Sequence, residues 1–169
     1  MTRAVTESPA VRPGTVGWEV RQARTEDVPA IAVAVVELLR ELGGTPPPQA
    51  AIEAEASAHI ADPSLGIVLV ATGGVGELFG VLTASWARAV QVAGRLLTIE
   101  VLWTRPGWRG AGVGAALVEA LVPAAGAEGA SRVEVGLPRE SFPALAATER
   151  FYLANGFEHI GPRLRRALG

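Results

Sequence analysis

The sequence contains no cysteine and no lysine. The absence of cysteine excludes disulfide bonds, zinc sites built from thiolates and a cysteine nucleophile. The absence of lysine excludes a Walker phosphate loop, because that loop needs a lysine directly before its serine or threonine. Tyrosine is nearly absent as well, since Tyr152 is the only one. Any step that needs a phenol therefore depends on that single residue.

Long apolar runs and an excess of basic residues are also missing. No run approaches the length of a membrane span, and residues 1–17 lack the apolar core of a signal peptide. Their mixture of Thr, Ser, Pro, Gly and Arg predicts a flexible N-terminal tail. A formal net charge of −2 argues against a nucleic-acid binder, which needs clustered basic side chains. We expect a cytoplasmic protein with neither a membrane nor a nucleic-acid partner, and a homodimer stays open.

The remaining composition is that of one globular domain. A chain of 169 residues with 49% hydrophobic content is long enough for one core, which we place over residues 18–169. Periodicity and turn residues predict strands over 18–23, 67–71, 77–86, 95–104 and 132–137, a last strand beginning over 157–160, and helices over 25–42, 49–60, 113–122 and 144–154. Short turns predict an antiparallel meander over 67–104. The crossover to 132–137 predicts a parallel neighbour for 95–104.

Residues 97–115 read LTIEVLWTRPGWRGAGVGA, which is typical of a strand, a glycine-rich turn and a helix. Such a junction directs unpaired backbone N–H groups outward beside the positive end of the helix dipole. It therefore favours an anion, most often a phosphate. Gly110, Gly112 and Gly114 permit close approach of the backbone, and Arg109 adds a guanidinium that can bind oxygens in pairs.

Arg109, Gly112 and Gly114 match the pyrophosphate-binding pattern [Q/R]-x-x-G-x-[G/A], and the surrounding strand and turn resemble the same region of the GCN5-related N-acetyltransferase (GNAT) superfamily. A second likeness lies in FYLANGFE at 151–158. The resemblance implies a single α/β domain with a twisted mixed sheet of six or seven strands, helices on both faces, and a V-shaped splay between strands 4 and 5. It also implies that the helix after the turn continues to about Ala127, whereas Pro123 alone predicts a kink or a stop at Val122.

The resemblance implies acetyl-CoA as co-substrate and no metal. Pantetheine would lie in the splay like an added strand, in contact with the backbone of Leu102, Trp103 and Thr104. A free N–H near Leu102 or Trp103 would polarise the thioester carbonyl. The pyrophosphate would bind the turn and the first turn of its helix, formed by Arg109, Gly110, Ala111, Gly112, Val113, Gly114 and Ala115.

Glu100 stands out because a carboxylate in the middle of a strand buried on both faces costs several kcal/mol if unpaired. Acetyl transfer to an amine needs a neutral nucleophile, so a carboxylate there can remove the ammonium proton. The position is similar to the glutamate of the I-E-D-L-[FY]-V run in polyamine-type acetyltransferases. The alternative is a structural glutamate neutralised by Arg88 or Arg105.

The resemblance also assigns Tyr152 a role, since the family tyrosine lies near the coenzyme sulfur and can protonate the leaving thiolate. A thiol pKa of about 8.5 and a phenol pKa near 10 are close enough for such a transfer. The alternative is a core aromatic beside Phe151 and Phe157. The chain departs from the family pattern at Leu145 and Thr148, where many relatives carry Asn and Ala, so an asparagine contact to pantetheine would be absent.

These features predict an N-acetyltransferase that transfers an acetyl group from acetyl-CoA to a primary amine of a small molecule by direct attack. In the family, the helices before residue 61 border the acceptor. Glu37, Glu41, Glu53 and Glu55 could attract an amine there, or simply form exposed helix faces. Trp86, Trp103 and Phe142 could line the acceptor site or belong to the core. A protein or peptide acceptor, and a CoA-binding module without turnover, stay open.

Overall fold

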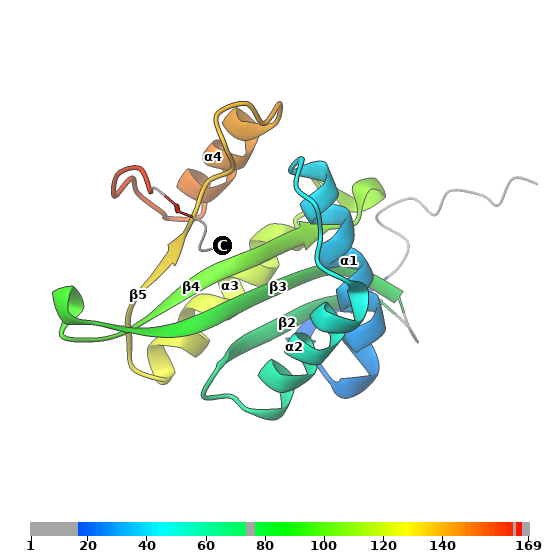
Figure 1. Cartoon of the computed structure of the whole chain (residues 1–169), viewed down its shortest axis with the longest axis horizontal. Helices are drawn as coiled ribbons and strands as arrows, with labels where there is room; N and C mark the ends of the chain where they lie inside the picture. Colours follow the sequence, from blue (N-terminus) through cyan, green and yellow to red (C-terminus); the bar gives the residue numbers. More distant parts are fainter. Residues whose placement is uncertain (1–16, 74–76, 164, 167–169) are drawn as a thin grey trace, which may run out of the picture.

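The computed structural model describes residues 17–73, 77–163 and 165–166, which form one sheet with helices on both faces (Figure 1). The tail predicted over 1–17 therefore lies, except for Gly17, outside the described residues. The elements are β1 (Trp18–Gln22), η1 (Thr25–Asp27), α1 (Val28–Glu41), α2 (Gln49–Ala61), β2 (Gly66–Gly73), β3 (Glu77–Ala89), η2 (Val90–Val92), β4 (Gly94–Thr104), η3 (Pro106–Trp108), α3 (Val113–Ala127), β5 (Ala130–Val135) and α4 (Leu145–Ala154). Among these described helices, none is both long and apolar enough to cross a bilayer.

The sheet is mixed, as predicted. Its strands follow the order β1-β2-β3-β4-β5, with antiparallel pairs up to β4 and a parallel pair between β4 and β5. The described residues contain five strands instead of six or seven, and the strand expected over 157–160 is absent there. Instead of pairing with a strand, Phe157 donates its backbone N–H to the carbonyl of Tyr152 at the end of α4 and packs its ring edge-on against that tyrosine.

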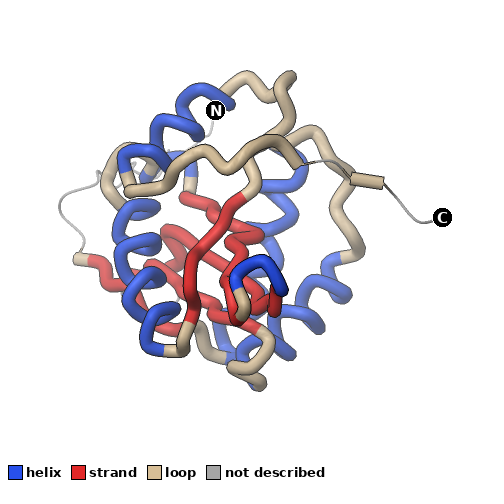
Figure 2. Tube along the Cα trace, turned by 90° about the vertical axis from the view of Figure 1, so that its left-hand side faces the viewer, coloured by secondary structure: helices blue, strands red, loops and turns tan. Residues whose placement is uncertain are grey.

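Helices cover both faces of the sheet. α1 and α2 lie on one face and α3 on the other, and Figure 2 shows the strands between them from the side. The apolar stripe of α1 buries Ile31 and Val35 against β2, β3 and β4, while α3 buries Leu117 and Leu121 against the opposite face. Full burial of each such side chain contributes about 2 kcal/mol. Two apolar layers thus hold the sheet that carries the site.

α3 continues through Pro123 to Ala127. The family resemblance implied this length, whereas the proline alone predicted a kink or a stop at Val122. Pro123 removes one helical hydrogen bond, but it lies on the exposed side of the helix, where water can satisfy the freed carbonyl. Close approach of α3 to the sheet is fixed by Gly80 of β3. A Cβ there would lie 2.7 Å from Cγ1 of Val113.

The sheet opens between β4 and β5. Their pairing ends where Ile99 lies opposite Val135, although β4 continues for five more residues to Thr104. In Figure 1, β5 diverges from β4 and leads to α4, which lies across the opening. The predicted splay is therefore present, and among the described residues one edge of β4 has no strand partner beyond Ile99.

Candidate functional site

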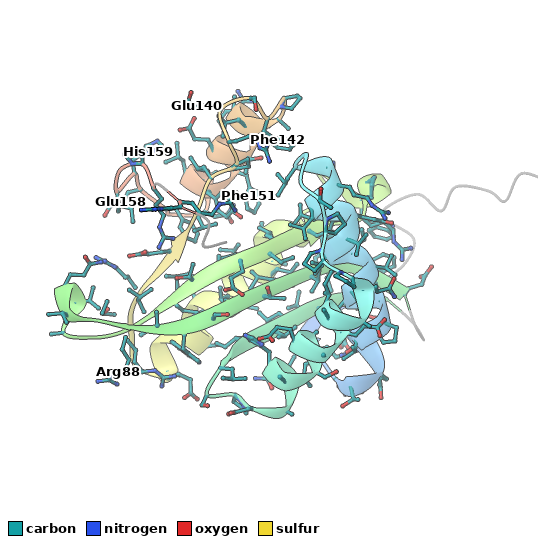
Figure 3. All side chains as sticks on the ribbon, in the orientation of Figure 1. Arg88, Glu140, Phe142, Phe151, Glu158 and His159 are labelled. Atoms are coloured by element: carbon teal, nitrogen blue, oxygen red, sulfur yellow. The ribbon has the colours of Figure 1, made fainter. Side chains whose placement is uncertain are left out.

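A cavity of about 690 Å³ occupies the splay. All site residues predicted from the sequence line it except Ala111, which packs against the core under α3. The predicted residues that line it are Glu100, Leu102, Trp103, Thr104, Arg109, Gly110, Gly112, Val113, Gly114, Ala115 and Tyr152. α4 closes the other side, and Figure 3 labels Phe142 and Phe151 there. The fold thus gathers residues 100–115 and α4 around one space.

The glycine turn leads directly into α3 at the edge of this cavity. Gly110 and Gly112 have φ values of 78° and 85°, which only glycine adopts without strain. A Cβ on either would meet no atom within 4 Å, so the backbone conformation, not crowding within the chain, requires glycine at both positions. The first N–H groups of the 15-residue α3 have no intrahelical acceptor. The turn therefore presents donors and a positive dipole end to the cavity.

Arg109 already has a carboxylate partner. Its Nη1 and Nη2 donate to the two carboxylate oxygens of Glu41 on α1, over 2.8 and 2.6 Å, and its Nε donates to the carbonyl of Thr104 over 3.3 Å. Both side chains are substantially exposed, and both line the cavity. Sequence reasoning missed this contact because 68 residues separate the two positions. An anion that binds at the turn has to share the guanidinium of Arg109 with Glu41 or displace Glu41 from it.

The backbone of β4 offers polar groups to the splay at alternate residues. The N–H of Arg105 donates to the carbonyl of Phe79 on β3, so the peptide groups of residue 105 face β3. Strand alternation then directs those of Trp103 toward β3 and those of Leu102 and Thr104 toward the splay. Of the two residues considered for a free N–H, Leu102 is the one with the suitable direction.

Glu100 is an extra residue in a β-bulge. Thr83 of β3 lies opposite Val101, whereas the next residue, Ala84, lies opposite Ile99. Glu100 therefore has no partner in the β3–β4 ladder. A bulge redirects the side chain at the inserted position, and here it places Glu100 and Val101 in the same cavity beneath α1 and α2.

The expectation that Glu100 is a buried charge is wrong, because the residue is exposed. β5 diverges at this level and does not cover it. The structural alternative also fails, since no ion pair among the described residues joins Glu100 to Arg88 or Arg105. Arg88 lies on the β3–β4 hairpin (Figure 3), and Arg105 lies over the ring of Phe79.

Tyr152 lines the same cavity and is 8% exposed. Its ring packs edge-on between Phe151 and Phe157. Burial raises the pKa of the Tyr152 phenol to about 12 because the phenolate would lose its hydration. The difference between the pKa of this phenol and that of a thiol, about 8.5, is therefore larger than the sequence analysis assumed with a phenol pKa near 10. Tyr152 is suited to donate a hydrogen bond to a thiolate throughout the neutral range.

A pH titration of tyrosinate absorbance tests this environment directly, because Tyr152 is the only tyrosine. We expect its midpoint near pH 12 in the folded protein and near 10 in denaturant. Because the folded protein retains the proton longer than the unfolded chain, stability falls as the pH rises from 10 to 12, by about 3 kcal/mol in total. Tyr152→Phe should remove both the signal and this loss. A midpoint of 10 in the folded state would contradict the burial.

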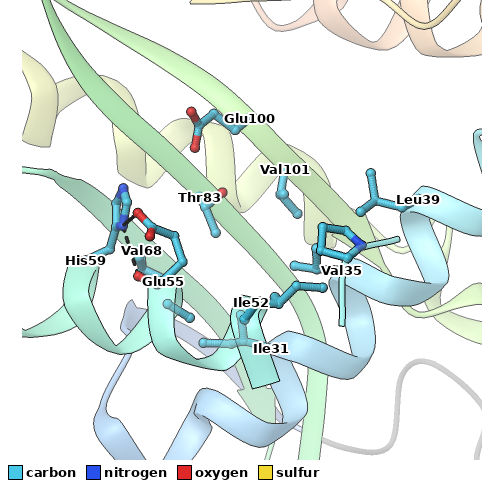
Figure 4. A pocket seen from close by; sticks show the side chains of 13 residues that line it. Ile31, Val35, Leu39, Ile52, Glu55, His59, Val68, Thr83, Glu100 and Val101 are labelled. Carbon is cyan, nitrogen blue, oxygen red and sulfur yellow. Dashed lines mark hydrogen bonds and ion pairs between the residues drawn. The ribbon is translucent and has the colours of Figure 1, made fainter. Parts of the chain in front are cut away.

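A second cavity, of about 280 Å³, lies between the sheet and the helices α1 and α2 (Figure 4). Glu100 lines both cavities and is thus the carboxylate at their junction. Among the aromatic candidates, Trp103 and Phe142 line the larger cavity and Trp86 lines neither. Trp86 instead stacks under Arg95 and donates to the carbonyl of Pro63. Within the described residues, no cluster of three or more His, Cys, Asp or Glu side chains could hold a metal.

The sequence model of the Acetyltransferase (GNAT) family matches residues 32–157. Curated protein sequences give no match. Among solved structures, an integron cassette protein from the mobile metagenome of Cole Harbour Salt Marsh is 25% identical, with a TM-score of 0.73 over 89% of this chain and 90% of that one. A predicted acetyltransferase from Clostridium acetobutylicum, solved with acetyl-CoA, is 15% identical, with a TM-score of 0.71 over 89% and 96%. The aminoglycoside N-acetyltransferase AAC(6')-Iy in complex with CoA is also 15% identical, with a TM-score of 0.72 over 94% and 99%.

Proposed function

The chain belongs to the Acetyltransferase (GNAT) family, and from this premise we propose that it transfers an acetyl group from acetyl-CoA to a primary amine of a small molecule. The observation that carries the proposal is the position of Glu100, which lines both the cavity in the splay and the cavity beneath α1 and α2. The first cavity would hold the coenzyme and the second the acceptor. Glu100 would then lie where the amine meets the thioester.

The cavity in the splay has the groups that a coenzyme needs. Arg109, the glycine turn and the start of α3 supply donors and positive charge for the pyrophosphate. The edge of β4 beyond Ile99 would supply the peptide groups of Leu102 and the N–H of Thr104 for pantetheine, as in the addition of a strand to a sheet edge, while the carbonyl of Thr104 accepts from Arg109. Trp103, whose peptide groups face β3, would contribute its side chain to the wall and no backbone contact.

The reaction would proceed in a ternary complex, because the chain has no cysteine to carry an acyl group. Glu100 takes a proton from the ammonium, directly or through water, and frees the nitrogen lone pair. That nitrogen attacks the thioester carbonyl carbon and forms the C–N bond, while the N–H of Leu102 stabilises the developing oxyanion. The C–S bond then breaks, and the nitrogen loses its second proton to solvent. The products are the acetamide, free CoA and one net proton.

Tyr152 would act on the leaving group. Its hydroxyl donates a hydrogen bond to the thiolate as the C–S bond breaks, and the final proton on sulfur comes from the tyrosine or from water. Because burial raises the pKa of Tyr152 to about 12, the group keeps its proton at any pH at which the enzyme would be assayed. Ionisation of this tyrosine would therefore not limit the rate below about pH 11.

Thiol release from acetyl-CoA tests the function, with amines, amino acids and peptides as acceptors and coenzyme binding measured separately by calorimetry. Acceptor-dependent thiol release with a small amine supports the proposal. Preference for a peptide favours the protein acetyltransferase. Coenzyme binding without turnover on any acceptor favours the CoA-binding module and overturns the enzyme.

Tyr152→Phe should lower kcat by about tenfold, the effect of losing one hydrogen bond to a charged group, with the Kd for the coenzyme unchanged. Stopped-flow thiol release at saturating substrates measures the first quantity, and calorimetry measures the second. Phe151→Leu, which changes the adjacent aromatic and leaves the hydroxyl, is the packing control. Equal losses in both variants would assign Tyr152 to the core alone.

A further inference from the structure

The cavity beneath α1 and α2 has a strongly asymmetric chemistry. Apolar side chains of α1, α2 and the sheet form most of its wall, namely Ile31, Val35, Leu39, Ile52, Val68 and Val101. In Figure 4, Glu55 and His59 lie toward the left and Glu100 toward the top, with Val68 labelled beside Glu55 and His59. Leu39, Val35, Ile52 and Ile31 lie toward the right and the bottom. A ligand that is complementary to this lining has one apolar end and one polar end.

The polar side of the cavity is acidic. Glu55 and Glu100 supply two carboxylates, and no arginine of the part of the chain that the structure describes contributes to the lining. His59 is fixed by its contacts: Nδ1 lies 3.0 Å from the carbonyl of Glu55, which can only accept, and Nε2 lies 3.1 Å from the hydroxyl of Ser85. Both ring nitrogens are thus engaged, and His59 serves as a wall of the cavity. The carboxylate of Glu55 also lies 3.3 Å from Nδ1 of His59, so Glu100 is the lining carboxylate that has no ion-pair partner among the described residues.

We propose, on the premise that the proposed function holds, that the acceptor is a small cationic amine on one compact apolar body with no acidic group. The ammonium lies between Glu100 and Glu55, and the body contacts Ile52 and the α1 side chains. A carboxylate or phosphate on the acceptor would meet the carboxylates of Glu100 and Glu55, and no arginine among the described lining residues would offset the repulsion. This excludes free amino acids and sugar phosphates as good acceptors.

The dimensions of the cavity beneath α1 and α2 limit the size of the apolar part of the acceptor. Ile52 and His59 lie seven residues apart on α2, a distance of about 10 Å along the helix. A volume of about 280 Å³ lies at the lower end of the range for ligand cavities. One aromatic ring with a short alkylamine chain matches both, whereas an oligosaccharide would extend outside.

The test compares 2-phenylethylamine with two matched amines at saturating acetyl-CoA. Phenylalanine adds a carboxylate, and ethanolamine removes the apolar body. We expect kcat/KM for 2-phenylethylamine to exceed that for ethanolamine by about 30-fold, from the buried ring, and that for phenylalanine by at least about tenfold, from charge repulsion. Higher kcat/KM with ethanolamine or phenylalanine would overturn the inference and leave the proposed function standing. Higher kcat/KM with a peptide would overturn both.

Two pairs of α2 variants locate the acceptor. Ala51 lines the cavity and Ala54 does not, and both are exposed. Ala51→Trp should raise KM for 2-phenylethylamine about tenfold, with Ala54→Trp unchanged. Glu55→Gln should raise the same KM about threefold, with Glu53→Gln unchanged because Glu53 does not line the cavity. Equal effects within each pair would overturn the placement.

A binding measurement separates the inference from the function. If no acceptor releases thiol although the coenzyme binds, the proposed enzyme fails. Calorimetry with 2-phenylethylamine in the presence of CoA then decides the inference. Binding that Ala51→Trp weakens at least about fivefold would sustain the site, and the absence of binding would overturn it.

Discussion

Replacing Glu100 by glutamine should lower kcat at neutral pH by about 100-fold, the usual contribution of a general base. Glutamine keeps the size of the side chain and the hydrogen-bonding capacity of its oxygen, but it cannot take a proton from an ammonium group. The Kd for the coenzyme should stay unchanged, because Glu100 carries no contact proposed for pyrophosphate or pantetheine. Initial rates of thiol release at saturating acetyl-CoA measure the effect.

The pH dependence distinguishes a lost base from a damaged site. In Glu100→Gln only amine that is already neutral reacts, so log kcat/KM should rise with unit slope up to the pKa of the free amine. The variant should therefore recover much of its activity at alkaline pH. Glu119→Gln, an exposed change on α3 away from both cavities, is the control. A wild-type rate in Glu100→Gln, or a loss equal at every pH, would end the assignment of Glu100 as base.

The sequence allowed correct prediction of most elements because their signals are local. The apolar stripe of α1, the alternation in the strands and the glycine turn each depend on neighbouring residues. Pro123 is the exception in which local physics misled and the family pattern was right. A proline effect depends on which side of the helix it occupies, and only tertiary packing decides that. The missing strand over 157–160 likewise reflects packing of Phe157 against α4.

The residues predicted for the site line the cavity in the splay, except for Ala111, but the environment of Glu100 was not predicted. A strand expected to be buried on both faces predicted a buried charge, whereas one inserted residue in the β3–β4 ladder directs the side chain of Glu100 toward a cavity. A bulge depends on the register between two strands, and a single strand gives little sign of it. The contact between Arg109 and Glu41 likewise depends on tertiary structure. Neighbouring residues give no sign of it, because α1 approaches the glycine turn only in the folded domain.

The two sides of the Arg109–Glu41 contact should have opposite effects on coenzyme affinity. Arg109→Ala should raise the Kd for acetyl-CoA by about 30-fold to 160-fold, because it removes charge-assisted hydrogen bonds worth about 2 to 3 kcal/mol. Glu41→Gln should lower the Kd about threefold to tenfold. An exposed ion pair contributes at most about 1 kcal/mol to the stability of the free protein, which limits what the coenzyme gains when the pair is lost. Loss of the pair frees the guanidinium of Arg109 and removes a negative charge beside the proposed pyrophosphate site. Calorimetric titration with CoA measures both.

The double variant shows whether Glu41 acts through Arg109. If the carboxylate competes with the coenzyme for the guanidinium, most of the gain from Glu41→Gln should vanish in the Arg109→Ala background, leaving only the relief of repulsion. Glu37→Gln removes the same charge one turn earlier on α1, outside both cavities, and should leave the Kd unchanged. If the pair instead serves only to fasten α1 to the turn, Glu41→Gln would weaken coenzyme binding and lower Tm together. A gain in affinity with unchanged Tm therefore identifies Glu41 as an internal competitor, which a bound coenzyme must displace from Arg109.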